Sequence, residues 1–496
     1  MTTMRTSLIR ELLLYRYRYV AGMALFIIVT ISLVCVRLDL APTGLSQTDM
    51  NSAVSSGTFD LLHPLEGSII DVPYRMLQKI SMSVFGITEW AIVLPSIIIG
   101  IASAMAFIAM VNRWFRLNVA LITGLIFVTS AGFLTMARTG HASIMTTFWL
   151  SLLLLAATNI VHPKGKTKLW FVIAAVVVPL SLYTPLMIYP FIAIFIAGFF
   201  HPHVRFTFTR TNKHQLIIGL AAILILLTPL IASVATHPPR ALELLGIPDH
   251  ALNSSQLITN AKFVAKSFFN LGSTVVGEIP QPIFGAASFI IIILGFLKTV
   301  QDWFSARSYM LLIWSAFFVP IALLNPQHLL IALVPGYLFM AIGIETLIRE
   351  WYKLFPTNPY ARLAGLMPLT ILLGGMMLSN IAQYFYGYLY GTPTTHYSLQ
   401  LSATREVLDR QANNNAVITT VVKPSEVAFY DLLRRDYPRM NVSDAHSGPI
   451  VRPTIIHDGV VADYGAIGTP KQIITSYKSK TDQVIVRYYE PVKPQQ

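Results

Sequence analysis

The sequence predicts an α-helical membrane protein that ends in a small water-soluble domain, and its composition carries this prediction. Hydrophobic residues make up 54% of the 496 residues, while Asp, Glu, Lys and Arg make up only 12%. Soluble globular proteins carry about 25% charged residues, so a soluble enzyme, a disordered protein and a disulfide-rich secreted domain are excluded. The single cysteine, Cys35, also excludes disulfides, CxxC redox chemistry and cysteine zinc sites.

The charged residues are distributed unevenly. Residues 1–390 hold 24 of the 36 basic and 13 of the 23 acidic residues. The charged fraction is roughly 9% there and roughly 21% over residues 391–496, where it approaches the soluble norm. We therefore expect a transmembrane domain over 1–390 and a soluble α/β domain over 391–496.

About 11 segments of the first 390 residues are apolar enough to be transmembrane helices, since a span takes roughly 20 apolar residues. They lie near 19–37, 88–111, 118–136, 143–161, 169–184, 187–200, 215–235, 283–298, 308–324, 328–348 and 364–386. The pair around Tyr183-Thr-Pro185 is short and also fits one broken span. The count is therefore open by one or two.

Lys and Arg gather in alternate loops, and such residues are enriched on the cytoplasmic side. They are Arg5, Arg10, Arg16 and Arg18; Arg113 and Arg116; Lys164, Lys166 and Lys168; Arg205, Arg210 and Lys213; Lys298 and Arg307; Arg349, Lys353 and Arg362. This pattern predicts a multi-pass protein of the cytoplasmic membrane with its N-terminus inside and its C-terminal domain outside. The net charge of +13 is then chiefly a topology signal, and nucleic acid is not expected as a partner.

Three segments are expected outside the membrane: loop 38–87, loop 236–282 and the C-terminal domain. The first loop has apolar residues at mixed helical spacing, which indicates short helices in the interface plane. In the C-terminal domain, Ser402–Gln411 and Ser425–Arg435 have helical patterns, and 415–422 and 482–489 have strand patterns. His446 and His457 lack metal-ligand spacing there, so we expect surface residues.

No Asp or Glu falls in the middle of a predicted span, the nearest being Glu345 near a cytoplasmic end. Ion-coupled transporters generally need ionisable groups near the bilayer midplane. This absence counts against ion-coupled transport and favours chemistry at a membrane face.

Asp49 is the main catalytic candidate, because it follows the first span by about a dozen residues. A carboxylate just above the bilayer is able to act as a general base on an incoming hydroxyl. The competing interpretation is that Asp49 caps a helix beginning at Met50. Further acids follow in the same loop at Asp60, Glu66 and Asp71.

Arg138 is the one basic residue in the short outer loops, which is against the topology bias. An arginine at headgroup level suits a phosphate, which it binds bidentately, and the competing interpretation is snorkelling to lipid headgroups. His141 follows Arg138 by three residues, and we interpret it as a loop or helix-start residue in preference to a catalyst. In the second long loop, Arg240 is a further candidate for a phosphate, as are His237, Lys262 and Lys266, although the two lysines also fit a solvated helix face.

These motifs resemble the GT-C membrane glycosyltransferases, especially the protein O-mannosyltransferase and lipid A aminoarabinose transferase families. The resemblance covers roughly residues 10–160 and lies in GLSQTDMNSA, IIDVPYRMLQKISMSVFG, TEWAIVLPSIIIG and LTMARTGHAS. Where the family shows Asp-Glu, this chain has Thr48-Asp49-Met50, so Asp49 corresponds to either the first or the second acid of the pair. Lipid A enzymes carry a lysine beside the loop-one proline, where this chain has Val72-Pro73, so an aminoarabinose donor is not implied.

The resemblance implies an inverting transfer of a sugar from a polyprenyl-phosphate donor to an acceptor hydroxyl on the external face. Asp49 would deprotonate the hydroxyl. Arg138, with Arg75, Lys79, Arg240 or His141, would bind the lipid phosphate. The external acids show no Asp-x-Asp spacing, so neither a metal nor a cofactor is expected. The acceptor, whether protein, lipid or glycan, stays open.

Two other classes of protein fit the hydropathy. A non-enzymatic flippase or exporter of lipid-linked sugars would explain the spans, but it leaves the external acid and the soluble domain without a role. A membrane scaffold whose C-terminal domain binds a partner would not need Asp49 at all.

Overall fold

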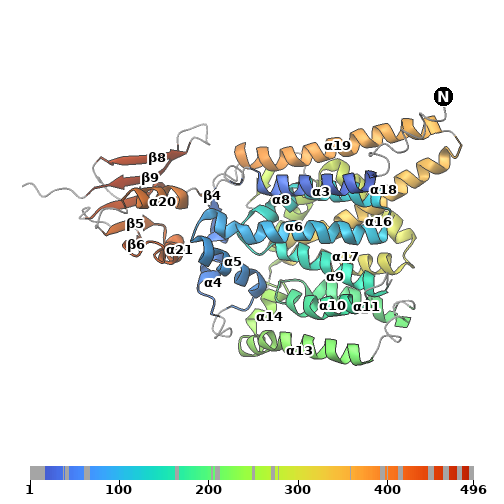
Figure 1. Ribbon diagram of the computed structural model, residues 1–496, viewed down its shortest axis with the longest axis horizontal. Coiled ribbons are helices and arrows are strands. Elements are labelled where there is room, and N and C mark those ends of the chain that lie inside the picture. Colours follow the sequence, from blue (N-terminus) through green and yellow to red (C-terminus); the bar gives the residue numbers. More distant parts are fainter. Residues whose placement is uncertain are drawn as a thin grey trace, which may run out of the picture.

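The structure is a computed structural model (Figure 1). It describes residues 17–36, 38, 44–60, 68–161, 167–200, 202, 205–206, 213–248, 252–269, 274–276, 279–357, 359–390, 397–398, 400–411, 417–444, 452–461, 469–476 and 483–490. Glu66, His446 and six of the basic residues used for orientation lie outside these ranges; the six are Arg5, Arg10, Arg16, Lys164, Lys166 and Arg210.

A multi-pass bundle of apolar helices forms the body of the protein (Figure 1). Its helices are α3 (Arg18–Cys35), α6 (Glu89–Trp114), α7 (Leu117–Thr129), α8 (Ala131–Arg138), α9 (Ile144–Val161), α10 (Thr167–Ser181), α11 (Ile188–Phe200), α13 (Lys213–Thr236), α16 (Ala286–Gln301), α17 (Ala306–Leu324), the 3-10 helix η1 (Pro326–Ala332), α18 (Leu333–Leu354) and α19 (Pro359–Tyr390). Within the described ranges, six of them are long and apolar enough to cross a membrane, or up to seven when one bent pair counts as a span. Each predicted span coincides with an apolar helix, yet the count of 11 stays a prediction because four of these helices are shorter.

The predicted span 118–136 is not one straight helix. It consists of α7 and α8, which meet at an angle of 61°. Ser130 has extended backbone angles at the junction, and its Oγ caps α8 by accepting a hydrogen bond from the backbone N–H of Phe133. A hydroxyl side chain that satisfies a free N–H in this way allows a new helix to start in a continuous apolar run.

Two glycines let α16 and α18 approach backbone to backbone. A Cβ on Gly295 would lie 1.7 Å from the carbonyl oxygen of Phe339, and a Cβ on Gly343 would lie 2.3 Å from that of Ile291. Small residues at such crossings replace side-chain contacts with close backbone packing, a common device in membrane bundles.

The first loop contains two helices, as the sequence predicts: α4 (Gln47–Gly57) and α5 (Val72–Phe85). The second long loop contains α14 (Pro239–Leu244), α15 (Ser254–Phe269) and a hairpin of β2 (Thr274–Val276) and β3 (Ile279–Gln281). Strand β1 (Leu45–Ser46), directly before α4, pairs antiparallel with β4 (Tyr397–Ser398) at the start of the C-terminal region.

The C-terminal region forms a five-stranded mixed sheet in the order β6-β5-β7-β9-β8. Its strands are β5 (Ile418–Val422), β6 (Met440–Asp444), β7 (Thr454–His457), β8 (Gln472–Ser476) and β9 (Gln483–Tyr489). Its helices are α20 (Gln400–Gln411), the 3-10 helix η3 (Pro424–Glu426), α21 (Val427–Leu433) and α22 (Asp458–Val461). Both predicted strands and both predicted helices are present, which agrees with a small α/β domain.

The loop-one helices lie between the membrane bundle and this sheet domain (Figure 1). Met50 of α4 and Ile87, just after α5, share one apolar cluster with Val422 and Phe429 of the sheet domain. Because this core is continuous, burial of apolar surface fixes the position of α4 from the side of the sheet domain.

The prediction that His457 lies at the surface is wrong. It ends β7, the central strand of the sheet, and its side chain is fully buried. Its Nε2 lies 3.0 Å from the hydroxyl of Thr404, and its Nδ1 lies 3.5 Å from a carboxylate oxygen of Glu426. Burial lowers the pKa of the His457 imidazole. Spacing along the chain did not reveal this environment because both partners come from other elements.

Candidate active site

Asp49 is part of the capping structure of α4. Ser46 precedes the helix, and its Oγ accepts a hydrogen bond from the backbone N–H of Asp49 at 3.1 Å. In return, Oδ2 of Asp49 accepts from the backbone N–H of Ser46 at 3.0 Å. This reciprocal pair is a capping box, so α4 begins at Gln47, three residues earlier than the cap interpretation placed it.

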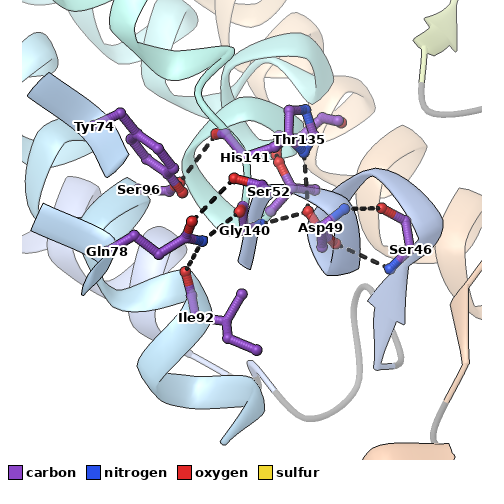
Figure 2. Close-up of polar contacts among 11 residues, drawn as sticks. Ser46, Asp49, Ser52, Tyr74, Gln78, Ile92, Ser96, Thr135, Gly140 and His141 are labelled. Carbon is purple, nitrogen blue, oxygen red and sulfur yellow. Dashed lines mark hydrogen bonds and ion pairs between the residues drawn. The ribbon is translucent and has the colours of Figure 1, made fainter. Parts of the chain in front are cut away.

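The other carboxylate oxygen of Asp49 points to the turn between α8 and α9 (Figure 2). Oδ1 accepts a hydrogen bond from the backbone N–H of Gly140 at 2.7 Å and lies 2.9 Å from Nδ1 of His141. Because a carboxylate oxygen only accepts, Nδ1 of His141 carries the hydrogen, and Nε2 is the nitrogen able to accept a proton in the neutral ring. Asp49 therefore both caps a helix and orients a histidine.

Gln78 of α5 holds the same turn from the opposite side (Figure 2). Its side-chain amide donates to the carbonyl oxygens of Gly140 at 2.7 Å and Ile92 at 3.0 Å. Its Oε1 accepts from the hydroxyls of Ser52 and Ser56 at 3.0 and 2.7 Å. The side chain is fully buried, so this network fixes α4, α5 and the His141 turn relative to one another.

Gly140 leaves no room for a side chain in this turn. A Cβ there would lie 2.6 Å from Ile92 and 3.4 Å from Cβ of Asp49. The absence of a side chain lets the backbone N–H reach the carboxylate of Asp49.

A cavity of about 1140 Å³ opens beside this network. Its wall includes polar residues from β1, α4, α5, α9, α14, α15 and η1 and from the segments just before α5, α9 and α11; they are Ser46, Gln47, Thr48, Asn51, Ser52, Ser55, Asp71, Tyr74, Arg75, His141, Ser143, Thr146, Thr184, Glu243, Thr259, Asn260, Gln327 and His328. Asp49 is 1% exposed and is absent from this wall, whereas His141 belongs to it. The pair therefore meets the cavity through His141.

Asp71, unlike Asp49, lies on the cavity wall itself, and the sequence marked it only as one of several loop acids. It has a left-handed backbone (φ 55°) directly before α5 and lines the wall. Its Oδ1 is buried and has no hydrogen-bond partner among the described residues. Burial raises the pKa of Asp71 to about 7, against the opposing effects of Thr184, Arg75 and His141; Glu243 adds to the rise.

Arg75 is the cation of the cavity wall, one helical turn after Asp71. Its guanidinium donates to the carbonyl oxygen of Ser68 at 2.6 Å. Of the candidate phosphate ligands, Arg75 and His141 line the cavity, while Arg138, Lys79 and Arg240 do not. Lys79 donates to the carbonyl oxygen of Phe59, and Arg240 donates to the Ser233 hydroxyl at 2.5 Å.

Arg138 lies inside the protein and is only 1% exposed. Its Nη1 donates to the carbonyl oxygens of Leu33 at 2.6 Å and Val36 at 2.8 Å, at the C-terminal end of α3. The guanidinium carbon also lies 5.6 Å from the ring centre of Tyr384 and 5.3 Å from that of Phe385 in α19. These contacts join α3, α8 and α19, and a cation suits the negative end of a helix.

Metal ligands are not grouped in the described part of the chain, where no three His, Cys, Asp or Glu residues are arranged to hold an ion. Lys262 and Lys266 belong to α15, whose residues on the cavity wall are Thr259, Asn260 and Phe263.

The fold and the family comparison agree on the class of protein. The profile of the dolichyl-phosphate-mannose-protein mannosyltransferases matches residues 73–232, which is part of the transmembrane region. No curated protein sequence matches the chain. The structure has the fold of the GT-C superfamily of membrane glycosyltransferases, as the sequence motifs predicted.

Solved structures of this superfamily resemble the chain over most of its length. ArnT from Cupriavidus metallidurans, crystallised with undecaprenyl phosphate, has 13% identity and a TM-score of 0.55, with 94% of this chain and 97% of ArnT covered. The oligosaccharyltransferase AglB from Archaeoglobus fulgidus, in complex with an inhibitory peptide and a dolichol-phosphate, has 13% identity and a TM-score of 0.53. That match covers 85% of this chain and 64% of AglB.

Proposed function

We propose that this protein transfers a sugar from a polyprenyl-phosphate donor to an acceptor hydroxyl, with inversion, on the external face of the cytoplasmic membrane. The observation that carries the proposal is the 2.9 Å contact between Asp49 and His141 at the wall of the large cavity. The GT-C fold supports it, because ArnT and AglB with this fold were solved with polyprenyl-type phosphates.

The donor phosphate would bind at Arg75. This guanidinium lines the cavity, and a planar fork of donors suits a phosphate better than a single ammonium group does. We assign this role to Arg75 in preference to Arg138, because Arg138 is buried among the carbonyl oxygens at the end of α3.

The His141–Asp49 pair would accept the acceptor proton. As the acceptor oxygen bonds to the anomeric carbon, its proton passes to Nε2 of His141. The bond from the anomeric carbon to the phosphate oxygen breaks, and its electron pair leaves with the lipid phosphate. Asp49 would hold the Nδ1–H and stabilise the imidazolium, so His141 is the base and Asp49 acts through it.

The test is the substitution Asp49→Asn in the full-length protein. The amide oxygen still accepts a hydrogen bond from the backbone N–H of Ser46, so we expect the cap to persist, whereas the amide nitrogen in place of Oδ1 no longer accepts from Gly140 or His141. We expect the rate of sugar transfer to fall about 100-fold or more, since general-base catalysis contributes about that much. Asp60→Asn is the matched control: it removes an exposed acid of the same loop away from the cavity, and transfer should stay unchanged.

The assay also separates an enzyme from a flippase of lipid-linked sugars. Transfer is measured with a radiolabelled polyprenyl-phosphate sugar, and donor binding is measured in parallel. Normal transfer by Asp49→Asn would overturn the role of Asp49. Donor binding with no transfer by the wild-type protein to any protein, lipid or glycan acceptor would favour the flippase.

A further inference from the structure

A second cavity, of about 330 Å³, lies at the other end of the membrane bundle. Helix α6 begins near the sheet domain and spans roughly 39 Å at 1.5 Å per residue, and its last residues, Arg113 and Trp114, line this cavity. The remaining wall comes from α9, α11 and the first turn of α17, including Thr158, Gly198 and Arg307. This cavity is therefore separate from the one at Asp71 and His141.

Two arginines of this wall, Arg113 and Arg307, have no acidic partner within the described part of the chain. Arg113 is partly buried, and its side chain has no hydrogen bond or ion pair with any described residue. Arg307 donates to the carbonyl oxygen of Trp114 at 3.3 Å, and its guanidinium carbon lies 5.1 Å from the ring centre of Phe115. Neither contact supplies a negative charge. Since charges removed from water are normally paired, two partly buried cations at one cavity favour an anionic ligand.

Apart from Thr158 and Ser305, the rest of the wall is apolar. Ala157, Val161, Ile194, Ala197 and Met310 line it. The neighbouring side chains Phe199 and Phe200 of α11 are 62% and 65% exposed. A ligand that fits this surface has an anionic head, which pairs with the two arginines, and a hydrocarbon chain, which packs against Phe199 and Phe200.

We propose that this cavity binds an anionic phospholipid. The phosphate lies between Arg113 and Arg307, where guanidinium groups are able to donate several hydrogen bonds to its oxygens. The acyl chains run along α11 and α17. The orientation predicted from Lys and Arg in alternate loops places this lipid in the cytoplasmic leaflet, whose anionic lipids attract basic residues near helix ends. The site does not depend on the transfer reaction proposed above.

The experiment measures binding of phosphatidylglycerol to the full-length protein in detergent by native mass spectrometry. Arg113→Gln is the informative variant, because it removes no hydrogen bond or ion pair to a described residue and should leave the fold intact. We expect about 10-fold weaker binding, since a hydrogen bond to a charged group contributes about that factor. The double variant with Arg307→Gln should bind more weakly still. Arg116→Gln, an exposed arginine outside the cavity, is the matched control and should bind as the wild type does.

Three results would overturn the proposal. They are equal binding by Arg113→Gln and the wild type, equal binding of phosphatidylcholine and phosphatidylglycerol, and displacement of the lipid by millimolar inorganic phosphate. The last result would indicate a site for a free anion. Binding that weakens with added salt in the wild type, but much less in the double variant, would support the two arginines as the ligands.

Discussion

Asp49 and His141 are joined by a 2.9 Å contact, yet only His141 reaches the large cavity. The carboxylate is enclosed by the N–H groups of Ser46 and Gly140 and by the imidazole. These three donors occupy the carboxylate, and Asp49 is only 1% exposed, so a substrate hydroxyl has no direct access to it. The geometry therefore favours a pair in which Asp49 orients the ring and the ring meets the substrate.

A double-mutant cycle tests this pairing. His141→Gln removes the accepting nitrogen, and we expect transfer to slow about 100-fold or more. The double variant with Asp49→Asn should be little slower than either single variant, because each substitution alone already disables the pair. Single-turnover rates at saturating donor measure the effect. Fully multiplicative losses would mean that the two residues act separately.

The pKa of Asp71 predicts a pH dependence of donor binding. Burial stabilises the neutral acid and raises the pKa to about 7, so the carboxyl is protonated below this pH and ionises as the pH rises through it. An ionised Asp71 then competes with the donor phosphate for Arg75 and repels it. We expect the KM for the donor to rise several-fold between pH 6 and pH 8.

The variant Asp71→Asn should remove this dependence and keep a low donor KM across the range. A pH dependence that came from the donor phosphate itself would appear in both the wild type and Asp71→Asn. The comparison of the two proteins therefore separates the effect of Asp71 from that of the donor. An identical KM profile in the wild type and Asp71→Asn would rule out Asp71 as the titrating group.

The sequence revealed the membrane bundle more fully than the site. Apolar runs mark each helix, because a bilayer imposes length and hydrophobicity locally. The break at Ser130 escaped notice since a single serine in an apolar run has no distinctive pattern. Asp49 and Arg138 stood out as rare charges, but their environments depend on contacts between α4, α8 and α3. Gln78 gave no signal at all, because its four partners are distant in the chain.

Arg138 is rare in the sequence as an outer basic residue, but its buried contacts indicate a structural role in place of phosphate binding. Arg138→Met should lower the stability of the bundle, since it leaves the carbonyl oxygens of Leu33 and Val36 without their donor. We expect a loss of about 1.5–3 kcal/mol, the contribution of hydrogen bonds to a charged group. Thermal unfolding in detergent measures it, and the folded fraction should keep its donor KM within about twofold. An increased donor KM at unchanged thermal stability would instead support the role in phosphate binding that the sequence predicted.

Two polar side chains of the sheet domain bind the backbone of Ile87, just after the loop-one helix α5. Asp436 accepts a hydrogen bond from the backbone N–H of Ile87 at 2.7 Å, while Arg405 donates to the carbonyl oxygen of the same residue at 2.5 Å. Asp436→Ala leaves that N–H without its partner, and we expect a loss of about 1–3 kcal/mol in the docking of the domain. Hydrogen exchange over residues 47–57 should then accelerate, because α4 shares its apolar cluster with the sheet domain.

The matched control is Asp431→Ala, which removes an acid of the same domain that is half exposed and lies 3.6 Å from Arg434. Surface ion pairs of this kind contribute little to stability, so exchange in α4 should match the wild type. If the capping box and the Gln78 network alone fix α4, exchange over residues 47–57 will be unchanged in Asp436→Ala as well. Faster exchange in Asp436→Ala together with slower sugar transfer would mean that the sheet domain helps to hold the Asp49–His141 pair in place.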